Sequence, residues 1–175
     1  GDSFSEMDLS KFNEMRFVKG IIEDCKKKFG GKSCKSGKYP VLLDREVFST
    51  LVSCFLNANN AIAVQKGSSF LQGCEGKKVA SKRLTIDEVP LKKGISYSFF
   101  DGEGVARENR TIVNHGILLT HFYNRETAKK ANRQTTGNAS TSLGKIGISY
   151  TNISVKAGRQ TKEEILKNVK EGIYI

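Results

Sequence analysis

Histidine is the side chain in this sequence best suited to acid-base chemistry, because its pKa lies near neutral pH. The 175 residues include two histidines, His115 and His121. His115 falls in an expected turn between Asn114 and Gly116, and His121 falls in an expected strand. A single histidine in a turn or on a strand face is usually structural or exposed. We therefore predict no catalytic role for either.

Two carboxylates stand close together in the run Asp101-Gly102-Glu103-Gly104. Paired carboxylates in flexible backbone could hold a metal ion or serve as acid and base. The alternative is a turn that is capped by its own aspartate, a common use of Asp before Gly. We favour the turn.

A run of small polar residues, Thr135-Thr136-Gly137-Asn138, could offer backbone N–H groups to an anion or to a peptide carbonyl. It matches neither a phosphate-binding P-loop nor a dinucleotide-binding fingerprint. We expect Gly137 to adopt a positive φ, which glycine tolerates and β-branched residues do not.

The four cysteines lie too far apart for a zinc knuckle or a redox motif, which needs pairs two to four residues apart. They are Cys25, Cys34, Cys54 and Cys74.

No stretch approaches the roughly 20 apolar residues of a membrane span. The start, Gly1-Asp2-Ser3, shows no signal peptide and no initiating Met, so we expect a piece of a longer protein, with reduced thiols, in the cytoplasm.

The net charge of +11 is typical of nucleic-acid-binding proteins, because basic side chains that neutralise phosphates release counterions. The lysines, however, form short dispersed clusters without the interleaved aromatic residues on which bases stack. We favour a solvated basic surface and keep nucleic-acid binding as the alternative.

Hydrophobic periodicity predicts the elements that must position these residues. Asp44 and Thr161 can each cap a helix. The predicted order is a helix over 9–29, a loop over 32–38, a buried strand over 39–43, a helix from 45 to 56, strand segments at 84–89 and 97–100, a hairpin with arms 111–113 and 117–123, a helical turn over 126–132, a strand over 146–155 and a helix over 162–170. This order lacks regular βαβ alternation, so we predict one α+β domain with a largely antiparallel or mixed sheet and two or three flanking helices.

Six short motifs, in a fixed order, resemble those of the TldD/PmbA family of peptidase-related proteins. They are Gly67-Ser68-Ser69-Phe70-Leu71, Asp101-Gly102-Glu103-Gly104, Asn114-His115-Gly116-Ile117-Leu118, Thr136-Gly137-Asn138, Thr151-Asn152 with Gly158, and Glu171-Gly172-Ile173-Tyr174. The resemblance runs from about Ser5 to Ile175. It implies a long protein with an N-terminal α/β domain and a C-terminal β-rich domain, of which this chain is a central part. It also implies a dimer that encloses a peptide-processing cavity.

The resemblance also implies which branch of the family the chain is similar to. TldD-type members carry a His-Glu-x-x-x-His motif on the helix after the strand that corresponds to residues 39–43. Two histidines on one helix face bind Zn²⁺, and the glutamate activates the bound water. The motif would fall near Ser53, Cys54 and Ala58, where the sequence has neither His nor Glu. The chain therefore resembles the PmbA members, also called TldE.

A PmbA/TldE-type chain is expected to be a non-catalytic subunit, without metal or cofactor of its own. Its expected partner in peptide processing and degradation is a zinc-dependent TldD-type metallopeptidase, or a second copy, and its substrate is a peptide rather than nucleic acid or membrane. The alternative is a nucleic-acid or DNA gyrase-associated binding module, which the charge and the family's older label suggest. The candidate cavity or scaffold residues are Asp101, Glu103, Gly104, Asn114, Gly116, Thr136, Gly137 and Asn138. The family's usual Asp-Asp-Glu-Gly run reads Asp101-Gly102-Glu103-Gly104 here, so a role that needs the second carboxylate is in doubt.

Overall fold

The computed structural model describes residues 8–169 and 171–175, which form two compact units that divide after Tyr39. The first unit contains a short 3-10 helix, Leu9–Lys11, and the helix α1, Glu14–Lys28. The side chain of Asn13 caps α1. The predicted first helix is therefore confirmed, with its start five residues later than the apolar pattern indicated.

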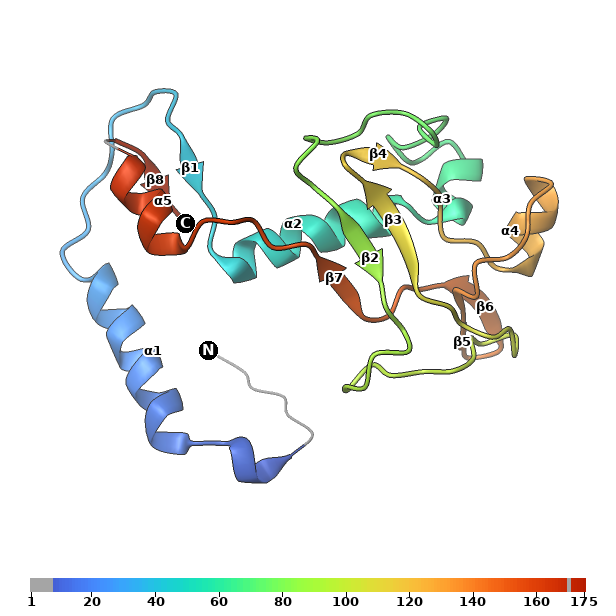
Figure 1. The fold of residues 1–175 in the computed structure, drawn as a ribbon, viewed down its shortest axis with the longest axis horizontal. Helices are drawn as coiled ribbons and strands as arrows, with labels where there is room; N and C mark the ends of the chain where they lie inside the picture. Colours follow the sequence, from blue (N-terminus) through green and yellow to red (C-terminus); the bar gives the residue numbers. More distant parts are fainter. Residues whose placement is uncertain (1–7, 170) are drawn as a thin grey trace. The chain divides into compact units, whose positions relative to one another are not determined.

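The second unit, from Pro40 onward, holds all the other elements (Figure 1). Its helices are α2 (Arg45–Ala58), α3 (Ala61–Gln65), α4 (Arg125–Lys130) and α5 (Lys162–Asn168). Its strands are β1 (Val41–Leu42), β2 (Ile86–Glu88), β3 (Arg110–Asn114), β4 (Ile117–Leu118), β5 (Ala139–Ser142), β6 (Lys145–Ile148), β7 (Ile153–Val155) and β8 (Ile173–Tyr174).

The main sheet is antiparallel, in the order β4-β3-β2-β7. A separate antiparallel hairpin is formed by β5 and β6, and β1 pairs in parallel with β8. The predicted α+β class with a largely antiparallel sheet is confirmed. Within the described part of the chain, no helix has both the length and the apolar character needed to cross a bilayer.

The hydrophobic core lies between α2 and the main sheet, and α2 crosses that sheet in Figure 1. Leu56 is the buried contribution of α2. The other fully buried members of this cluster are Leu71, Ile86, Ile112, Val113, Leu118 and Phe122. Removal of these side chains from water is the main source of stability, and it holds the loops at both ends of the strands in place.

The predicted hairpin is confirmed as β3 and β4, which are joined by a tight turn. His115 and Gly116 have φ of 46° and 80°, a pair of positive values typical of two-residue hairpin turns. The second arm is shorter than predicted and ends at Leu118. Beyond it, the N–H groups of His121 and Phe122 bond to Glu75 and Asn59, so this segment leaves the sheet.

Three predicted strands are corrected by the structure. Residues 97–100 form a loop of exposed aromatic side chains whose only β contact is the single bridge between Phe100 and Ala106. Residues 39–43 contribute only β1, and Val41 is half exposed rather than buried. The strand over 146–155 is divided into β6 and β7, because the N–H of Thr151 bonds to the carboxylate of Glu88 instead of a neighbouring strand.

Two predicted helices are confirmed with small changes at their ends. The helical turn over 126–132 is α4, which Asn124 caps together with Thr127. The last helix, capped by Thr161 and Glu164, ends at Asn168. The predicted end at Lys170 lies outside the described residues. The sequence patterns did not indicate α3 or β5.

Candidate functional site

Asp101 holds its own loop closed. One carboxylate oxygen, Oδ1, accepts the N–H groups of Glu103 and Val105, each at 2.9 Å. The other, Oδ2, accepts the N–H of Ala139 in β5, also at 2.9 Å. The predicted turn is therefore confirmed. Because both oxygens already accept hydrogen bonds, this carboxylate is a structural anchor between the loop and β5.

Glu103 connects the same loop to α4. Its Oε2 accepts the N–H of Arg125, the first residue of the helix, at 2.8 Å. A carboxylate at a helix N-terminus satisfies a free N–H group and interacts favourably with the helix dipole. Asp101 and Glu103 thus point to different partners and do not form a pair that could act on one substrate.

The run Thr136-Gly137-Asn138 lies against this loop region. The hydroxyl of Thr136 accepts the N–H of Tyr123 at 2.7 Å. Gly137 has a φ of 68°, as expected from the sequence. A Cβ atom at Gly137 would lie 3.1 Å from the carbonyl oxygen of Ala106. The structure therefore brings the second and fourth motifs of the sequence together.

Replacement of Gly137 by valine should lower the free energy of unfolding by about 1 to 3 kcal/mol, because positive φ is strained for a β-branched residue and the carbonyl of Ala106 is close. Urea denaturation measures the loss. Gly144→Val is the matched control, since Gly144 has a similar φ of 73° but no atom within 4 Å of its Cβ position. A larger loss in the control would show that the contact with Ala106 does not matter.

Asn138 belongs to a buried polar network around Glu88, at the end of β2. Both residues are almost completely inaccessible to water. Glu88 Oε1 accepts the side-chain amide of Asn138 at 2.8 Å and the N–H of Thr151 at 3.0 Å. Burial raises the pKa of Glu88, although these hydrogen bonds and the charges of Arg110 and Arg107 oppose that effect.

This network is incompletely satisfied. Among the described residues, four buried side-chain atoms lack a hydrogen-bond partner, and all belong to residues that bond to Glu88 or interact with its charge. They are Arg107 Nη1, Arg110 Nε, Asn138 Oδ1 and Thr151 Oγ1. Buried polar groups without partners are rare in native proteins, so this concentration marks an unusual site.

Asn114 and Gly116 lie apart from the other candidate residues. Asn114 ends β3 and Gly116 lies in the turn after it, whereas Arg110, which interacts with the charge of Glu88, begins that strand. Asn114 is exposed, and the N–H of Gly116 bonds to Leu84 at 2.9 Å. The eight sequence-derived candidates therefore do not form one cavity. Two of them build the hairpin turn, and Gly104 lies in the loop closed by Asp101.

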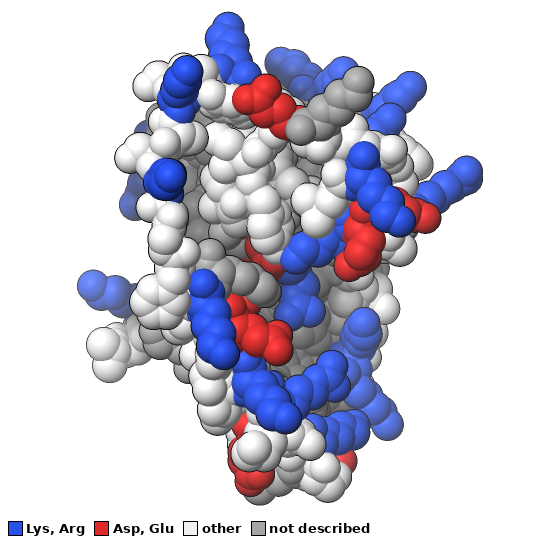
Figure 2. All heavy atoms as spheres, turned by 90° about the vertical axis from the view of Figure 1, so that its left-hand side faces the viewer, with Lys and Arg blue, Asp and Glu red and all other residues white. Residues whose placement is uncertain are grey.

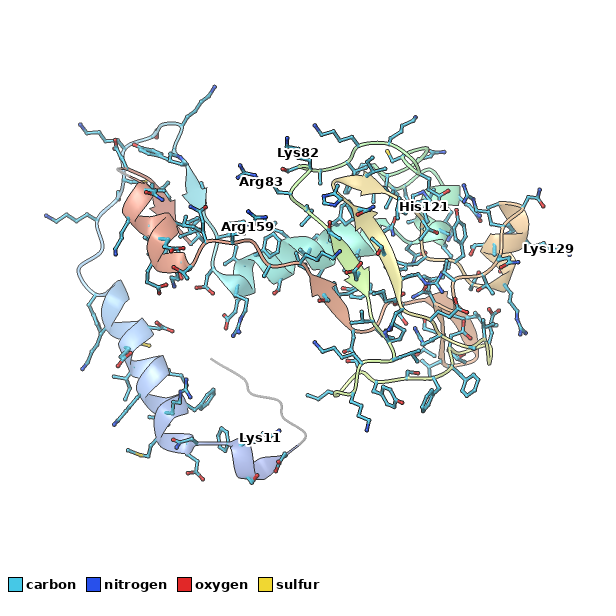
Figure 3. All side chains as sticks on the ribbon, in the orientation of Figure 1. Lys11, Lys82, Arg83, His121, Lys129 and Arg159 are labelled. Atoms are coloured by element: carbon cyan, nitrogen blue, oxygen red, sulfur yellow. The ribbon has the colours of Figure 1, made fainter. Side chains whose placement is uncertain are left out.

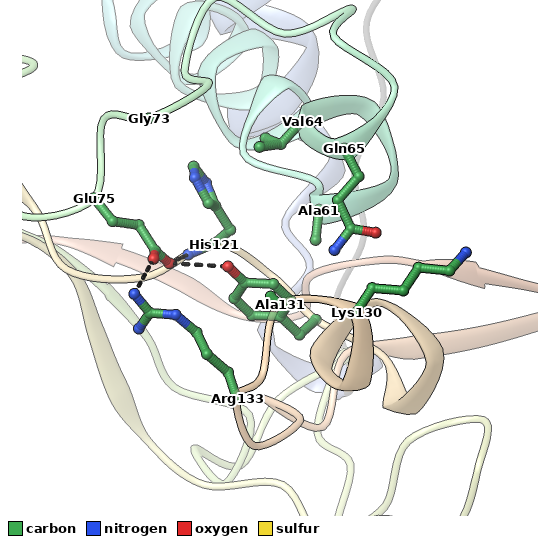
Figure 4. A pocket seen from close by; sticks show the side chains of 10 residues that line it. Ala61, Val64, Gln65, Gly73, Glu75, His121, Lys130, Ala131 and Arg133 are labelled. Atoms are coloured by element: carbon green, nitrogen blue, oxygen red, sulfur yellow. Dashed lines mark hydrogen bonds and ion pairs between the residues drawn. The ribbon is translucent and has the colours of Figure 1, made fainter.

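A cavity of about 440 Å³ lies where α3 and α4 approach each other (Figure 4). Among the candidate residues and histidines considered from sequence, only His121 lines it. The lining residues are Ala61, Val64, Gln65, Gly73, Glu75, His121, Tyr123, Lys130, Ala131 and Arg133. Apolar side chains from α3 therefore share the cavity with several charged and titratable groups.

Glu75 organises the polar wall of this cavity. Its Oε1 accepts the backbone N–H of His121 at 2.8 Å and the hydroxyl of Tyr123 at 3.2 Å. Its Oε2 forms an ion pair with Arg133 Nη2 at 2.6 Å, as Figure 4 shows. Burial, and then the negative charge of Glu75, raise the pKa of Tyr123 to about 12. Tyr123 is therefore a neutral hydrogen-bond donor at physiological pH.

His121 is buried, and it presents a neutral ring to the cavity. Its Nδ1 lies 2.7 Å from Oδ1 of Asn59, whose amide nitrogen donates to the carbonyl of Thr120 at 3.0 Å. This amide orientation assigns the ring proton to Nδ1 and leaves Nε2 as an acceptor. Burial lowers the pKa of His121; the charge of Glu75 opposes this effect and that of Arg133 adds to it. The sequence pattern did not indicate that His121 lines a cavity.

Stability should decline below about pH 6.5 because of His121. The pKa of His121 is lowered in the folded state. Its contribution to stability is therefore fully present above pH 6.5, the pKa of the unfolded state, and is lost as the pH falls through the folded-state pKa. Glu88 has the opposite effect. Its pKa is raised in the folded state, so its contribution to stability is fully present below pH 4.5 and is lost as the pH rises through the folded-state pKa. Urea titrations of wild type and His121→Gln from pH 8 to pH 5 isolate the histidine. The difference between them should change with pH; a constant difference would contradict this assignment.

The cavity residues carry no recognisable sequence motif. Glu75, His121 and Arg133 come from three different segments, and Asn59, which bonds to the His121 ring from outside the lining, lies 62 positions from it in sequence. Nowhere in the described residues, this cavity included, do three His, Cys, Asp or Glu side chains gather closely enough to hold a metal ion. The four cysteines are free thiols.

Comparison with known proteins assigns the chain to a family. Residues 36–175 match the family model described as the PmbA/TldA metallopeptidase C-terminal domain. The chain belongs to this family. The resemblance to TldD/PmbA proteins that the six sequence motifs indicated is therefore confirmed.

Individual members of the PmbA/TldA family show the same similarity. A metalloprotease from Methanocaldococcus jannaschii is 31% identical over 147 residues, which are 82% of this chain and 33% of the relative. A PmbA homologue, named as a metalloprotease, from Buchnera aphidicola subsp. Baizongia pistaciae is 32% identical over 168 residues, 93% of this chain and 36% of the relative. The chain thus spans about a third of the length of the curated relatives it matches.

A solved structure confirms the fold of this PmbA/TldA-family chain. The structure of a proposed modulator of a DNA gyrase from Thermotoga maritima superposes with a TM-score of 0.87 at 32% identity. The match covers 94% of this chain and 38% of the other. The likeness therefore includes nearly all of the elements described above.

Helix α2 is the helix that follows strand β1, so it occupies the place where the resemblance locates the zinc motif of TldD-type members. Ser53 faces a small cavity of about 190 Å³ against β7, and Cys54 is exposed. A serine, a cysteine and an alanine stand at the three positions named from the sequence. In this family member, α2 therefore offers no imidazole pair.

Proposed function

We propose that this chain is part of a non-catalytic, PmbA-type subunit that works with a zinc-dependent TldD-type metallopeptidase in peptide processing. The observation that carries the proposal is the residue content of α2 in a member of the PmbA/TldA family. Ser53, Cys54 and Ala58 stand where the zinc-binding motif would be. A catalytic zinc site needs about three protein ligands around one open position, and these side chains cannot form one.

The geometry of the sequence motifs supports a scaffold role. Asp101 uses one carboxylate oxygen to close its own loop and the other to bind β5, and Glu103 binds the start of α4. Just before β5, the hydroxyl of Thr136 accepts the N–H of Tyr123, and the backbone at Gly137 leaves little room for a side chain beside Ala106. These residues shape the domain and leave no pair of carboxylates free to act as acid and base.

The main sheet also suggests how peptide could be held. β7 lies at one end of the sheet, and no other strand in the described residues pairs with its outer edge. At the opposite end, β4 is partly covered by the bridge between Lys78 and Ile117. An exposed edge can accept an extended peptide as an additional strand through backbone hydrogen bonds. The proposal therefore assigns peptide holding to β7 and cleavage to the partner.

The test is reconstitution with a TldD-type protein. The chain alone should bind far less than one equivalent of zinc and should not hydrolyse peptide, whereas co-purification with the partner should accompany zinc-dependent hydrolysis. Metal analysis and a peptidase assay with and without added zinc provide the readouts. One tightly bound zinc per chain, or hydrolysis by the chain alone, would contradict the proposal.

The charge of +11 is the observation that favours DNA binding as a second function. Basic side chains are spread in several groups over the face in Figure 2, with acidic side chains beside some of them. Lys82 and Arg83 are exposed on the loop before β2 (Figure 3). We expect only weak duplex binding that declines steeply with salt. Sub-micromolar, sequence-dependent binding at physiological salt would favour the second function.

A further inference from the structure

We propose that the cavity between α3 and α4 binds the C-terminal residue of a peptide, whose carboxylate is received by Arg133. This inference deepens the proposed function, on which it rests for the choice of a peptide as ligand. It concerns a different place from the α2 and β7 features above. Its support comes from the placement of one guanidinium group, the balance of charge and the chemistry of the remaining wall.

Arg133 is held in position by a largely shielded carboxylate. Glu75 is mostly shielded from water, and the N–H of His121 and the hydroxyl of Tyr123 fix its Oε1. Its Oε2 binds Arg133, whose side chain remains 51% exposed at the cavity (Figure 4). A guanidinium has five N–H donors, so the contact with Glu75 uses only part of them. The others suit a carboxylate, and a pre-positioned arginine loses little freedom on binding it.

The lining has one more basic than acidic side chain, although Lys130 is itself ion-paired with Glu126 outside the cavity. Glu75 carries one negative charge, whereas Lys130 and Arg133 carry two positive charges. Neither ring adds charge at neutral pH, because the pKa of His121 is lowered and that of Tyr123 is raised. A cationic ligand would have to compete for Glu75, whose oxygens already accept three donors.

The rest of the cavity fits the other parts of a terminal residue. Val64, Ala61 and Ala131 provide an apolar surface for a small or medium side chain. The acceptor nitrogen Nε2 of His121 suits the amide N–H that precedes a peptide carboxylate. The volume of about 440 Å³ is within the usual range for small-ligand sites. Carboxylate, amide N–H and apolar side chain occur together at a peptide C-terminus.

Binding of short peptides to the wild-type protein tests the proposal directly. The probes are N-acetyl-Ala-Ala-Leu, its C-terminal amide, and N-acetyl-Ala-Glu-Leu amide, which carries its carboxylate on a side chain. Calorimetry near pH 7.5 should show that the first binds at least about tenfold more tightly than the other two, because the charge-assisted hydrogen bonds to Arg133 are lost in the first amide and misplaced in the second. Equal affinities for acid and amide would overturn the proposal, and equal affinity for the glutamate probe would overturn the assignment to a terminus.

Two neighbouring lysines give a matched pair of variants. Lys130 lines the cavity, whereas Lys129 is exposed and points away from it (Figure 3). Arg133→Gln should weaken binding of the acid about tenfold and Lys130→Gln by a smaller factor, while Lys129→Gln should leave it unchanged. Wild-type affinity in Arg133→Gln would overturn the proposal. Thermal unfolding should show that these exposed substitutions leave the fold intact.

The outcome is separable from that of the proposed function. Peptide binding is measured on this protein alone and needs neither zinc nor a partner. If reconstitution with a TldD-type protein failed but the acid bound more tightly than the amide, the cavity assignment would stand and the subunit role would fall. The reverse result would remove only the cavity assignment.

Discussion

Replacement of Gly116 by alanine should lower the free energy of unfolding by about 3 to 5 kcal/mol, which is large for a single added methyl group. Gly116 has a φ of 80°, and a Cβ atom there would lie 2.6 Å from the carbonyl oxygen of Ser81 and closer still to that of Ala80. These are backbone atoms, so no side-chain rotation relieves the overlap. The turn cannot move away easily, because Gly116 exchanges hydrogen bonds with Val79, Ala80 and Leu84.

Gly104→Ala separates the two causes of this loss. Gly104 has a similar φ of 72°, but no atom lies within 4 Å of its Cβ position. It should therefore lose only about 1 to 2 kcal/mol, the cost of the left-handed conformation. Urea denaturation of both variants measures the difference. If the two glycines lost the same stability, the close approach of residues 80 and 81 to the turn would not be what demands glycine.

Truncation of Glu88 to alanine should lower the free energy of unfolding by about 3 to 5 kcal/mol, comparable to breaking other buried ionic networks. The change removes the acceptor of the Thr151 N–H and of one Asn138 amide hydrogen. It also removes the nearest compensating charge for Arg107 and Arg110, which already contain buried nitrogens without partners. Donors left unsatisfied in the interior each carry a desolvation penalty.

Glu88→Gln is the isosteric control for that truncation. Its side-chain carbonyl can accept the same two hydrogen bonds, so most of the loss should be avoided. The variant should also lack the decline in stability that Glu88 causes as pH rises through its raised pKa. Chemical denaturation at several pH values tests both points. A loss in the glutamine variant as large as in the alanine variant would mean that charge, rather than hydrogen bonding, holds the network together.

Substitutions in the scaffold and substitutions at the cavity should affect the proposed peptide-processing role in different ways. Gly116 and Glu88 determine whether the sheet and its loops are built, whereas Arg133 and Lys130 are exposed side chains at the cavity. Substitution of the first pair should impair function through folding. Substitution of the second pair should impair only binding, so the two classes of effect can be distinguished by stability measurements.

The parts of the fold that depend on neighbours in sequence were accessible from the sequence. Three features follow from contacts within a few residues or from the allowed conformations of one residue. They are helix α2 with its cap at Asp44, the turn at Gly116, and the positive φ of Gly137. The six ordered motifs were sufficient to indicate the family. The predicted strand over residues 97–100 was wrong. Its aromatic pattern favours a strand, but such residues form one only where a neighbouring strand is present to pair with them.

Only the tertiary structure decided how the polar residues are grouped. In sequence, Asp101 and Glu103 allowed either a carboxylate pair or the favoured turn, but not their separate partners: Asp101 binds β5 and Glu103 binds α4. The cavity depends on hydrogen bonds that Glu75 accepts from residues 46 and 48 positions away. Such contacts leave no spacing or periodicity in the sequence, since any two segments can be brought together once a shared hydrophobic core holds them.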